Sequence, residues 1–580
     1  MQNINSKLAE IFKQMSLMYR YTGNKDRFRA ISYERASNVI KNMEDDISEI
    51  KDQYQLENLK GIGKSIAEKI IEFLNTGKIK RHEELKNELP IDLMELIDVR
   101  GFGPATLKQI YNELQISTKQ ELLFALQSGK LNSLKGFGSK KIKTMKDALN
   151  VYNNFDKRML LWDAINFSEE VIKYIKNCKW VKLVEIAGSL RRQKETIGDI
   201  DLILSCNSND NLQISNYLID EKFASIVLAK GKERVSVITL NQNKQIDIMI
   251  VNEKDFGSAL QHFTGSKEHN IALRTAMQKR GLKLSEHGIF NINTNQLNHY
   301  KTEIDFYKSI GYDWIPPEMR ENKGELELAE KKQLPTLVNY SDIKGDMQMH
   351  SSWSDGLFSI DIIVEYVRNN FNYEYIVITD HSKTSKIAHG ITEKQLEKQI
   401  KEIKKINQKL GLEFVKTGIE VDILKNGNLD FSNELLSQLD WVTASIHSGF
   451  KTDNTDRIIR ACENKYVDCI GHPTGRLIGK RNAYSLDFKE IITVAKKTGT
   501  AFEINSQPER MDLNEDYAVM AKEQNVMLVI NTDAHQLSEL NYMKTGISVA
   551  RRAWCEKKHI LNTFSWDKLT QWRKNRIEKS

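Results

Sequence analysis

The stretch Ile186-Ala-Gly-Ser-Leu-Arg-Arg-Gln-Lys-Glu-Thr-Ile-Gly-Asp-Ile-Asp-Leu-Ile-Leu204 joins two apolar runs through a segment rich in turn-forming and charged residues. The runs, 181–187 and 202–204, are typical of buried strands. Asp199 and Asp201 lie two residues apart, so on a strand their side chains project from the same face. Two carboxylates this close repel each other unless cations lie between them. The pair therefore predicts a divalent metal site, with a solvated strand end as the alternative.

A third acidic residue interrupts another apolar run, Gln245-Ile-Asp-Ile-Met-Ile-Val251. Its carboxylate, Asp247, needs a partner because an isolated charge in an apolar strand is costly. Three acids with hard oxygen ligands suit Mg²⁺ or Mn²⁺ and in-line phosphoryl transfer.

The order of these motifs resembles the nucleotidyltransferase palm, and the full spacing is similar to that of family X DNA polymerases, the relatives of polymerase beta. The resemblance implies that Asp199 and Asp201 bridge two metals and that Asp247 holds the metal that activates the primer 3′-hydroxyl. It also implies a set of residues around the nucleoside triphosphate, namely Gly188, Ser189, Arg192 and Gly198.

Composition limits the other classes of protein. A chain of 580 residues predicts several domains, and its net charge of +7 permits nucleic-acid binding without requiring it. The five cysteines are scattered and form no Cys-x-x-Cys pair, which argues against a zinc ribbon or a disulfide framework. Because no signal-peptide core or membrane span appears, we expect a soluble cytoplasmic protein.

The first 150 residues predict helices, since apolar residues recur at helical spacing in 8–18 and 36–50. A short pattern with two glycines occurs three times in this region, each time before a helix-forming segment. Backbone N–H groups in such a hairpin can approach a phosphate. The pattern resembles the helix-hairpin-helix, which binds DNA backbones and implies K⁺ or Na⁺ at the motif. Its glycines are Gly61, Gly63, Gly101, Gly103, Gly136 and Gly138.

Residues 1–85 are similar to the small lyase domain of polymerase beta. The stretch Gly61-Ile-Gly-Lys-Ser-Ile-Ala-Glu-Lys-Ile70 places Lys69 at the Schiff-base position, with Arg29 and Tyr33 near the supporting positions. Such a lysine can attack a sugar aldehyde if nearby cations lower its pKa. The alternative is an exposed lysine that only binds phosphate.

The segment that follows the palm, from Phe256 to Arg274, resembles the family's thumb. The resemblance places Phe263 near the incoming sugar, Gly265 at the nucleotide, Asn270 at the base edge and Arg274 at the template. His262 stands where a tyrosine is usual, which puts sugar discrimination in question.

From residue 341 onward, apolar runs repeatedly end in metal-competent side chains, with helical segments between them. Alternating strands and helices predict a parallel α/β barrel, whose functional groups gather at the carboxyl ends of the strands. The set is similar to the PHP domain. By that resemblance, two or three divalent metals (Mn²⁺, Zn²⁺ or Fe²⁺) would be held by His350, Asp355, His381, Glu420, His447, His472, Asp533 and His535.

One position departs from the PHP pattern. The first motif reads Asp346-Met-Gln-Met-His350, so that Gln348 offers an amide oxygen where an imidazole is usual. An amide is a weaker ligand for these metals, and this position bears on whether the domain is active. Arg476 and Arg481, in the loop after His472, are candidates for holding phosphate.

These patterns predict a multidomain α+β and α/β protein. The expected parts are a helical DNA-binding domain (1–85), helix-hairpin-helix fingers (86–150), a palm (151–260), a thumb (261–318), a linker (319–340), a PHP domain with a distorted (β/α) barrel (341–572) and a tail (573–580).

The function expected from the resemblance is a DNA-directed DNA polymerase that fills short gaps during repair, with a Mn²⁺-dependent 3′-5′ exonuclease in the PHP domain and cleavage at abasic sites. Its partners would be gapped or primed duplex DNA and deoxynucleoside triphosphates, and the protein would be a monomer. Four alternatives remain: an inactive PHP domain that braces the polymerase, a non-templated nucleotidyltransferase, a non-catalytic DNA-binding scaffold, and a protein whose main activity is the PHP phosphoesterase with the polymerase secondary.

Overall fold

The computed structural model describes the chain except residues 1–3, 23–25, 42–46, 51, 58, 60–61, 95, 98–100, 140, 144, 147–157, 208, 241, 480 and 580. The chain divides into two compact units, Met1–Lys157 with Leu212–Asp247 and Arg158–Asn211 with Ile248–Ser580. None of the helices in the described part of the chain is both long and apolar enough to cross a membrane.

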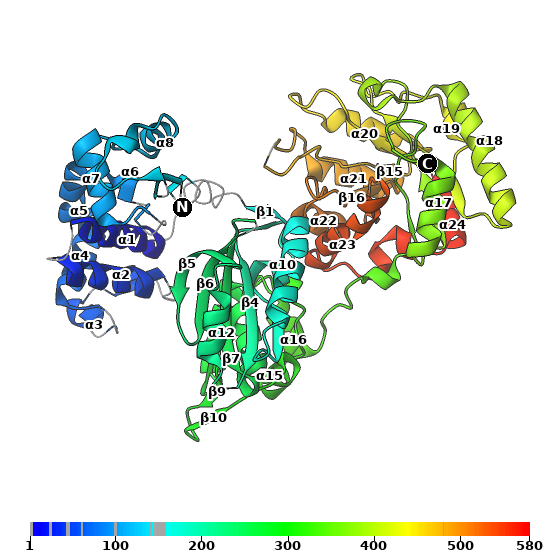
Figure 1. Cartoon of the computed structure of the whole chain (residues 1–580). Helices are drawn as coiled ribbons and strands as arrows, with labels where there is room; N and C mark the ends of the chain where they lie inside the picture. Colours follow the sequence, from blue (N-terminus) through cyan, green and yellow to red (C-terminus); the bar gives the residue numbers. More distant parts are fainter. Residues whose placement is uncertain are drawn as a thin grey trace. The chain divides into compact units, whose positions relative to one another are not determined.

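The described residues of the first 150 form helices and no strand, as predicted (Figure 1). The predicted helix 36–50 differs: α2 ends at Lys41, 42–46 lie outside the described residues, and 47–49 form a single 3-10 turn. The helices are α1 (Ile4–Thr22), α2 (Arg27–Lys41), α3 (Gln53–Glu57), α4 (Lys64–Thr76), α5 (Lys80–Glu88), α6 (Ile91–Met94), α7 (Pro104–Leu114) and α8 (Lys119–Gln127).

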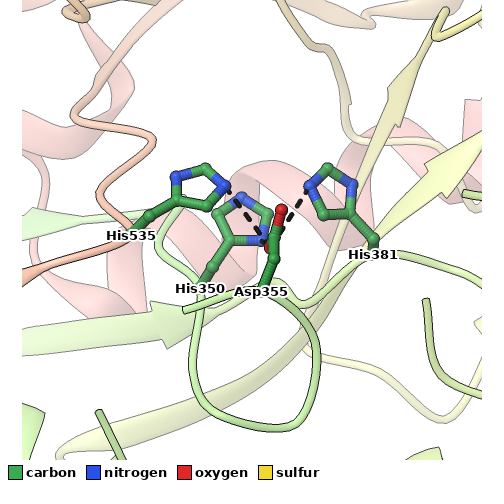
Figure 2. A group of neighbouring side chains, drawn as sticks. All are labelled: His350, Asp355, His381 and His535. Atoms are coloured by element: carbon green, nitrogen blue, oxygen red, sulfur yellow. Dashed lines mark ion pairs between the residues drawn. The ribbon is translucent and has the colours of Figure 1, made fainter. Parts of the chain in front are cut away.

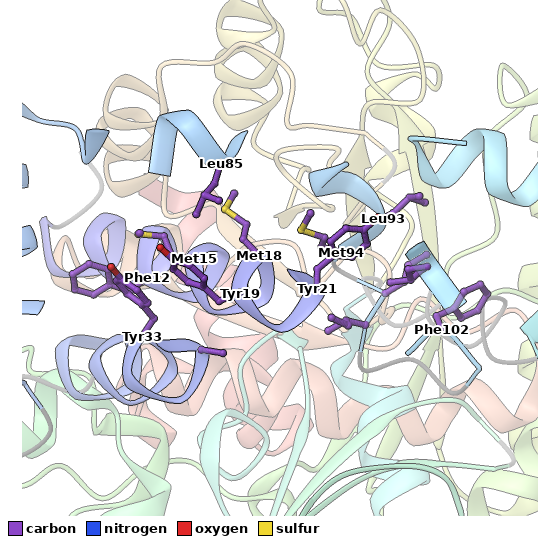
Figure 3. Packing of buried hydrophobic residues seen from close by; sticks show 14 of the residues in the cluster. Phe12, Met15, Met18, Tyr19, Tyr21, Tyr33, Leu85, Leu93, Met94 and Phe102 are labelled. Carbon is purple, nitrogen blue, oxygen red and sulfur yellow. The ribbon is translucent and has the colours of Figure 1, made fainter. Parts of the chain in front are cut away.

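One apolar core holds these helices together. Phe12, Met15 and Met18 recur at helical spacing along α1 and are buried, because they line the face of α1 that packs on its neighbours. Tyr33 of α2 stacks on Tyr19 of α1 with ring centroids 5.4 Å apart. Figure 3 shows these side chains at one end of a cluster that has Leu93 and Met94 of α6 and Phe102 at its other end, so the core runs on into the second helical repeat.

The palm is a five-stranded sheet in the order β2-β4-β7-β6-β5. The predicted run 181–187 yields only the short outer strand β2, and Leu183 is 47% exposed, so this run is buried on one face rather than both. The palm strands and helices are β1 (Met159–Leu160), α10 (Leu161–Lys176), β2 (Leu183–Ile186), α11 (Gly188–Arg191), β3 (Thr196–Ile197), β4 (Ile200–Cys206), α12 (Asn211–Leu218), β5 (Ala224–Lys230), β6 (Arg234–Thr239) and β7 (Gln245–Asn252).

The thumb extends further than predicted. Leu326 and Ala329 of α16 pack with Phe306 and Tyr307 of α15 in one buried cluster, so part of the expected linker 319–340 belongs to the thumb core. The thumb elements are α13 (Phe256–Thr264), α14 (Lys267–Gln278), β8 (Leu282–Ser285), β9 (Gly288–Asn291), β10 (Gln296–Asn298), α15 (Glu303–Ser309) and α16 (Glu325–Lys331).

Seven parallel strands, β11 to β17 in chain order, form the predicted barrel. A bridge between Met349 and Ala534 links the segment after β11 to the segment after β17 and nearly closes the sheet. The strands are β11 (Gly345–Asp346), β12 (Tyr375–Ile378), β13 (Val415–Asp422), β14 (Trp441–Ser445), β15 (Cys469–Ile470), β16 (Ala501–Asn505) and β17 (Leu528–Asn531).

Helices connect and cover these strands, and the last one differs from the expected tail. Arg573 and Arg576 of α24 both pair with the buried Asp468, so 573–579 are part of the barrel. The helices are α17 (Ile360–Asn370), α18 (Glu393–Leu410), α19 (Asn433–Leu436), α20 (Thr455–Glu463), α21 (Phe488–Thr498), α22 (Glu515–Glu523), α23 (Met543–Arg552) and α24 (Trp566–Lys579).

Candidate active sites

The three palm carboxylates come together. Asp199 immediately precedes β4, Asp201 lies on β4, and Asp247 lies on β7, the neighbour of β4 in the sheet. Each offers one oxygen, and these oxygens lie within 4.8 Å of one another. Such a group of acids suits a hard divalent cation.

Asp247 has the partners that its burial requires. Its carboxylate accepts hydrogen bonds from Arg234 Nη2 at 3.2 Å, from Gln245 Nε2 at 2.8 Å and from Ser236 Oγ. These donors fix the orientation of the carboxylate on the sheet.

Residues 188–191 form the single helical turn α11 beside the carboxylates. Gly188 has φ +58°, and a Cβ atom there would lie 1.8 Å from Asp201 Oδ2, so only glycine fits. Ser189 and Arg192 line a hollow of about 380 Å³. Arg192 Nη1 donates to the carbonyl oxygen of Thr264. A Cβ atom added to Gly265 would lie 3.2 Å from the same Nη1. Gly198 is exposed and lies near Arg158.

The predicted thumb residues gather around His262. Asn270 Nδ2 donates to the carbonyl oxygen of His262 at 2.7 Å, and Arg274 Nη2 lies 2.9 Å from His262 Nδ1. The ring of Phe263 lies edge-on to that of His262, with centroids 4.8 Å apart. His262, the departure from the family pattern, therefore contacts Asn270 through its backbone carbonyl and Arg274 through its ring.

The barrel brings all eight predicted ligands to the carboxyl ends of its strands. Figure 2 shows Asp355 between His381 and His535, at 3.7 and 3.4 Å, with His350 beside them. Three groups of side chains each offer ligand atoms within 4.8 Å of one another: His350, Asp355, His381 and His535; His381, Glu420 and His447; and His350, Glu420 and Asp533.

Glu420 lies at the centre of these groups. Its carboxylate oxygens lie 2.9 Å from His381, 3.4 Å from His447 and 3.2 Å from His472. Neither oxygen forms a hydrogen bond, although both are buried. Buried carboxylate oxygens without donors are costly, and a divalent cation among them would remove that cost. The donor set therefore fits metal ions.

The field of the cluster favours cations. Burial alone would raise the pKa of Asp355, but the hydrogen bond from His535 and the nearby imidazoles outweigh it and lower the pKa to about 2. Burial alone would lower the pKa of His535, but Asp355 and Asp533 raise it to about 10. The carboxylates that favour a proton on His535 favour a divalent cation in the same way.

Gln348 is fully buried beside the ligands. Its Nε2 lies 3.5 Å from Asp533 Oδ1, and its Oε1 is among the buried oxygens of the described residues that form no hydrogen bond. The amide oxygen is thus available to a cation.

The two arginines predicted as phosphate holders differ. Arg481 lines a cleft of about 640 Å³ over the ligands, with its guanidinium 4.0 Å from the ring centroid of Phe450. Arg476 instead pairs with Glu195 of the palm at 2.6 Å and donates to the carbonyl oxygen of Met511. Its guanidinium thus joins two domains.

Several residues of this site were not predicted. Asp422 accepts a hydrogen bond from His447 Nδ1 at 2.6 Å, and Asn505 Nδ2 donates to Asp533 Oδ2 at 3.0 Å. Arg510 lines the cleft with its Nε 3.9 Å from Asp533. Asp422 lies two residues after Glu420 on β13, so strand alternation could have indicated it. No sequence pattern singles out Arg510.

The hairpin glycines precede helices as expected. α4 begins after Gly63 and α7 after Gly103, which leaves helix N-termini at the hairpins. Gly101 and Gly136 have φ of +94° and +85°, Gly138 precedes a helical residue, and Gly61 lies outside the described residues. Lys69 lines a separate hollow with Arg29, Tyr33 and Arg81, and its Nζ donates to Glu72 at 2.6 Å.

Comparisons with known proteins agree with this arrangement. Family models match a helix-hairpin-helix domain at 3–79, a SAM-like helix-hairpin-helix tandem at 93–150 and a DNA polymerase beta thumb at 259–321. DNA polymerase lambda from Rattus norvegicus is 23% identical over 55% of this chain and 56% of its own length. A "Probable phosphatase" from Thermoanaerobacter sp. (strain X514) is 33% identical over 26% of this chain and 65% of its own length.

One relative matches almost end to end. The "DNA polymerase/3'-5' exonuclease PolX" of Bacillus subtilis (strain 168) is 36% identical over 93% of this chain and 94% of its own length. With the palm carboxylates, the thumb and the barrel in this order, the chain belongs to the family X DNA polymerases that carry a C-terminal PHP domain.

Proposed function

We propose that the protein is a template-directed DNA polymerase that fills short gaps during repair and shortens the same strand with its barrel. The observation that supports the polymerase most is the group of three palm carboxylates beside the Gly188-Ser189 turn. The name of the Bacillus subtilis relative carries both activities.

In the palm, each group of residues has a distinct task. Ser189, Arg192 and the backbone around Gly188 and Gly198 hold the triphosphate, and the thumb residues hold the nascent base pair. Mg²⁺ or Mn²⁺ bound by Asp199, Asp201 and Asp247 would neutralise phosphate charge while the primer 3′-hydroxyl attacks the α-phosphate and pyrophosphate leaves. The backbone N–H groups at the hairpin glycines, with K⁺ or Na⁺, bind DNA phosphates.

In the barrel, the eight ligands and Gln348 would hold two or three divalent metals, with Mn²⁺, Zn²⁺ or Fe²⁺ suited to the mixed imidazole and carboxylate set. Metals there supply Lewis-acid charge and activate water for attack on a phosphodiester. Arg481 and Arg510 of this chain hold the phosphate, and the cleft of about 640 Å³ accepts the terminal nucleotide. The products are a nucleoside monophosphate and a strand shortened by one residue. The same chemistry would cleave a strand at an abasic site.

Template dependence separates this proposal from non-templated nucleotide addition. A labelled primer on a one-nucleotide gap with a 5′-phosphate should gain the nucleotide that pairs with each of the four templating bases in turn. Extension of the same primer as a single strand, or addition that ignores the templating base, would favour the alternative.

The barrel activity has its own test. In Mn²⁺ without nucleotides, the primer should shorten from its 3′ end, and His350→Ala should abolish the shortening. His389→Ala is the matched control, because His389 is an exposed histidine of the same barrel outside the ligand groups. If the wild type extends the primer but never shortens it, the barrel has only a structural role.

We also propose lyase action at Lys69, which lines a hollow of about 980 Å³ with four cationic neighbours. Borohydride should trap the protein on a 5′-deoxyribose phosphate, and Lys69→Ala should remove the trapped species. DNA binding that survives without trapping in the wild type would leave Lys69 a phosphate ligand only.

The proposal places the enzyme in the cytoplasm as a monomer. Light scattering on the eluting protein should give the mass of one chain, 67.0 kDa.

A further inference from the structure

Arg552, the last residue of the barrel helix α23, reaches into the palm. Its side chain is 3% exposed, and its Nη1 donates to the backbone carbonyl oxygen of Arg192 at 2.7 Å. The same Nη1 lies 3.2 Å from Glu321 Oε1, and its Nε donates to Glu515 of the barrel helix α22. A buried guanidinium with three acceptors is held in one orientation.

Arg192 depends on the same acceptor. Its Nε donates to Glu321 Oε1 at 3.1 Å, and Lys194 Nζ lies 3.3 Å from that oxygen. Glu321 therefore joins two palm cations to one barrel cation. Burial alone would raise the pKa of Glu321, but Arg552, Arg192 and Lys194 outweigh burial and lower it, so the carboxylate remains charged at neutral pH.

The hollow in front of Arg192 is also built from both domains. Ser189, Arg192 and Lys194 of the palm line it together with Asn514, Glu515 and Asp516 of the barrel. The residues proposed to hold the triphosphate thus share one hollow, of about 380 Å³, with barrel side chains.

We propose that Arg552 is a positioning residue for the polymerase: the barrel holds Arg192 in place for the triphosphate. The inference rests on the proposed function of Arg192. Arg552 fixes the backbone carbonyl of Arg192 directly, and it fixes the guanidinium of Arg192 through Glu321. Without Arg552, Arg192 must be ordered when the nucleotide binds, and this lost preorganisation weakens nucleotide binding more than it slows the chemical step.

Single-nucleotide insertion kinetics test this inference. Arg552→Ala should raise the KM for the nucleotide about tenfold, as expected for the loss of charge-assisted hydrogen bonds, with a smaller change in kcat and an unchanged KM for DNA. Arg552→Lys should recover part of the effect, because lysine keeps the charge but donates from one point.

Arg551→Ala is the matched control. Arg551 also ties the barrel to the thumb, through Glu318 at 2.7 Å and Asn339 at 2.7 Å, but it makes no described contact with Arg192. Its KM for the nucleotide should stay within about twofold of the wild type. Strand shortening in Mn²⁺ reports that the barrel of each variant is folded.

The outcomes separate the inference from the proposed function. If the wild type extends the primer and Arg552→Ala leaves the KM for the nucleotide unchanged, or if Arg551→Ala raises it equally, Arg552 is only an interface residue. If Arg552→Ala does not fold, Arg552→Gln, which keeps an amide donor and most of the side-chain volume but removes the charge, should raise the same KM, and an unchanged KM there overturns the inference. Failure of the wild type to extend any primer refutes the proposed function itself.

Discussion

At Gly188 the backbone passes so close to Asp201 that no side chain fits between them. The turn holds the carboxylate on one side and presents Ser189 and Arg192 on the other. Because Gly188 has no Cβ atom, the metal site at Asp201 and the nucleotide site at Ser189 and Arg192 can lie directly next to each other.

Gly188→Ala should lower primer extension by about a hundredfold or more, because the added methyl group displaces the Asp201 carboxylate. Extension and strand shortening should be measured on the same preparation, and shortening should persist. Gly311→Ala is the control: Gly311 also has a positive φ, +85°, but its Cβ would meet nothing within 4 Å. That change costs only backbone strain of about 1–2 kcal/mol. Equal extension by the two variants would show that the contact with Asp201 is unimportant.

Gln348→Ala should raise the Mn²⁺ concentration needed for half-maximal strand shortening by about tenfold or more, because a buried oxygen without a hydrogen bond is removed from the ligand groups. Gln399→Ala is the matched control: Gln399 is equally buried and its Oε1 also forms no hydrogen bond, but its Nε2 donates to Asp380 at 2.6 Å, which is not a proposed ligand, whereas Gln348 Nε2 faces the ligand Asp533. Superimposable Mn²⁺ titrations of Gln348→Ala and the wild type would mean that the amide oxygen binds no metal.

The residues that the sequence could not indicate share a physical reason. Asp199, Asp201 and the barrel histidines stand out because they interrupt or end apolar runs. Arg510 and Arg552 each follow another charged residue, Glu509 and Arg551, and their roles depend on contacts with residues distant in the chain, as for Arg552 with Arg192, 360 positions away. No local pattern encodes such a contact.

At the scale of elements, the differences between expectation and structure concern an edge strand, a strand whose polar residues lie inside its apolar run, and helices with distant partners. The apolar run 181–187 predicts a strand that is buried on both faces. β2 lies at the edge of its sheet and is buried on one face only. β16 was not predicted to contribute to the site, because Glu503 and Asn505 lie inside its apolar run rather than after it. The sequence predicted five of the other barrel strands, β12 to β15 and β17, because each holds a ligand near its carboxyl end or is followed by one. The expected linker and tail are amphipathic helices whose partners lie elsewhere in the chain.

Two elements of palm and thumb meet at Glu303, the first residue of α15. Its carboxylate pairs with Arg191 of α11 at 2.6 Å and with the buried Arg320 at 2.7 Å. Burial alone would raise the pKa of Glu303, but the two arginines outweigh burial and lower it to about 2.

Glu303→Gln should therefore destabilise the protein, and the effect should depend on pH. A folded-state pKa below the unfolded value means that the ion pairs stabilise fully above about pH 4.5 and are lost as pH falls toward 2. The shift corresponds to about 3 kcal/mol at neutral pH. The difference in Tm between wild type and variant should be greatest at pH 6–7 and shrink toward pH 3. A pH-independent difference would contradict the depressed pKa.

At the scale of the whole molecule, the two proposed centres catalyse opposite reactions on one strand. The palm adds a nucleotide with three carboxylates, and the barrel removes one with a mixed imidazole and carboxylate set. Because the two ligand sets share no residue, each activity should survive the loss of the other.

Two separate catalytic centres can be tested in one time course: a labelled primer on a one-nucleotide gap, with nucleotides and Mn²⁺, incubated with wild type, Asp199→Ala and His350→Ala. We expect Asp199→Ala only to shorten the primer and His350→Ala only to lengthen it. Loss of both activities in either variant, or extension that survives Asp199→Ala, would contradict two separate catalytic centres.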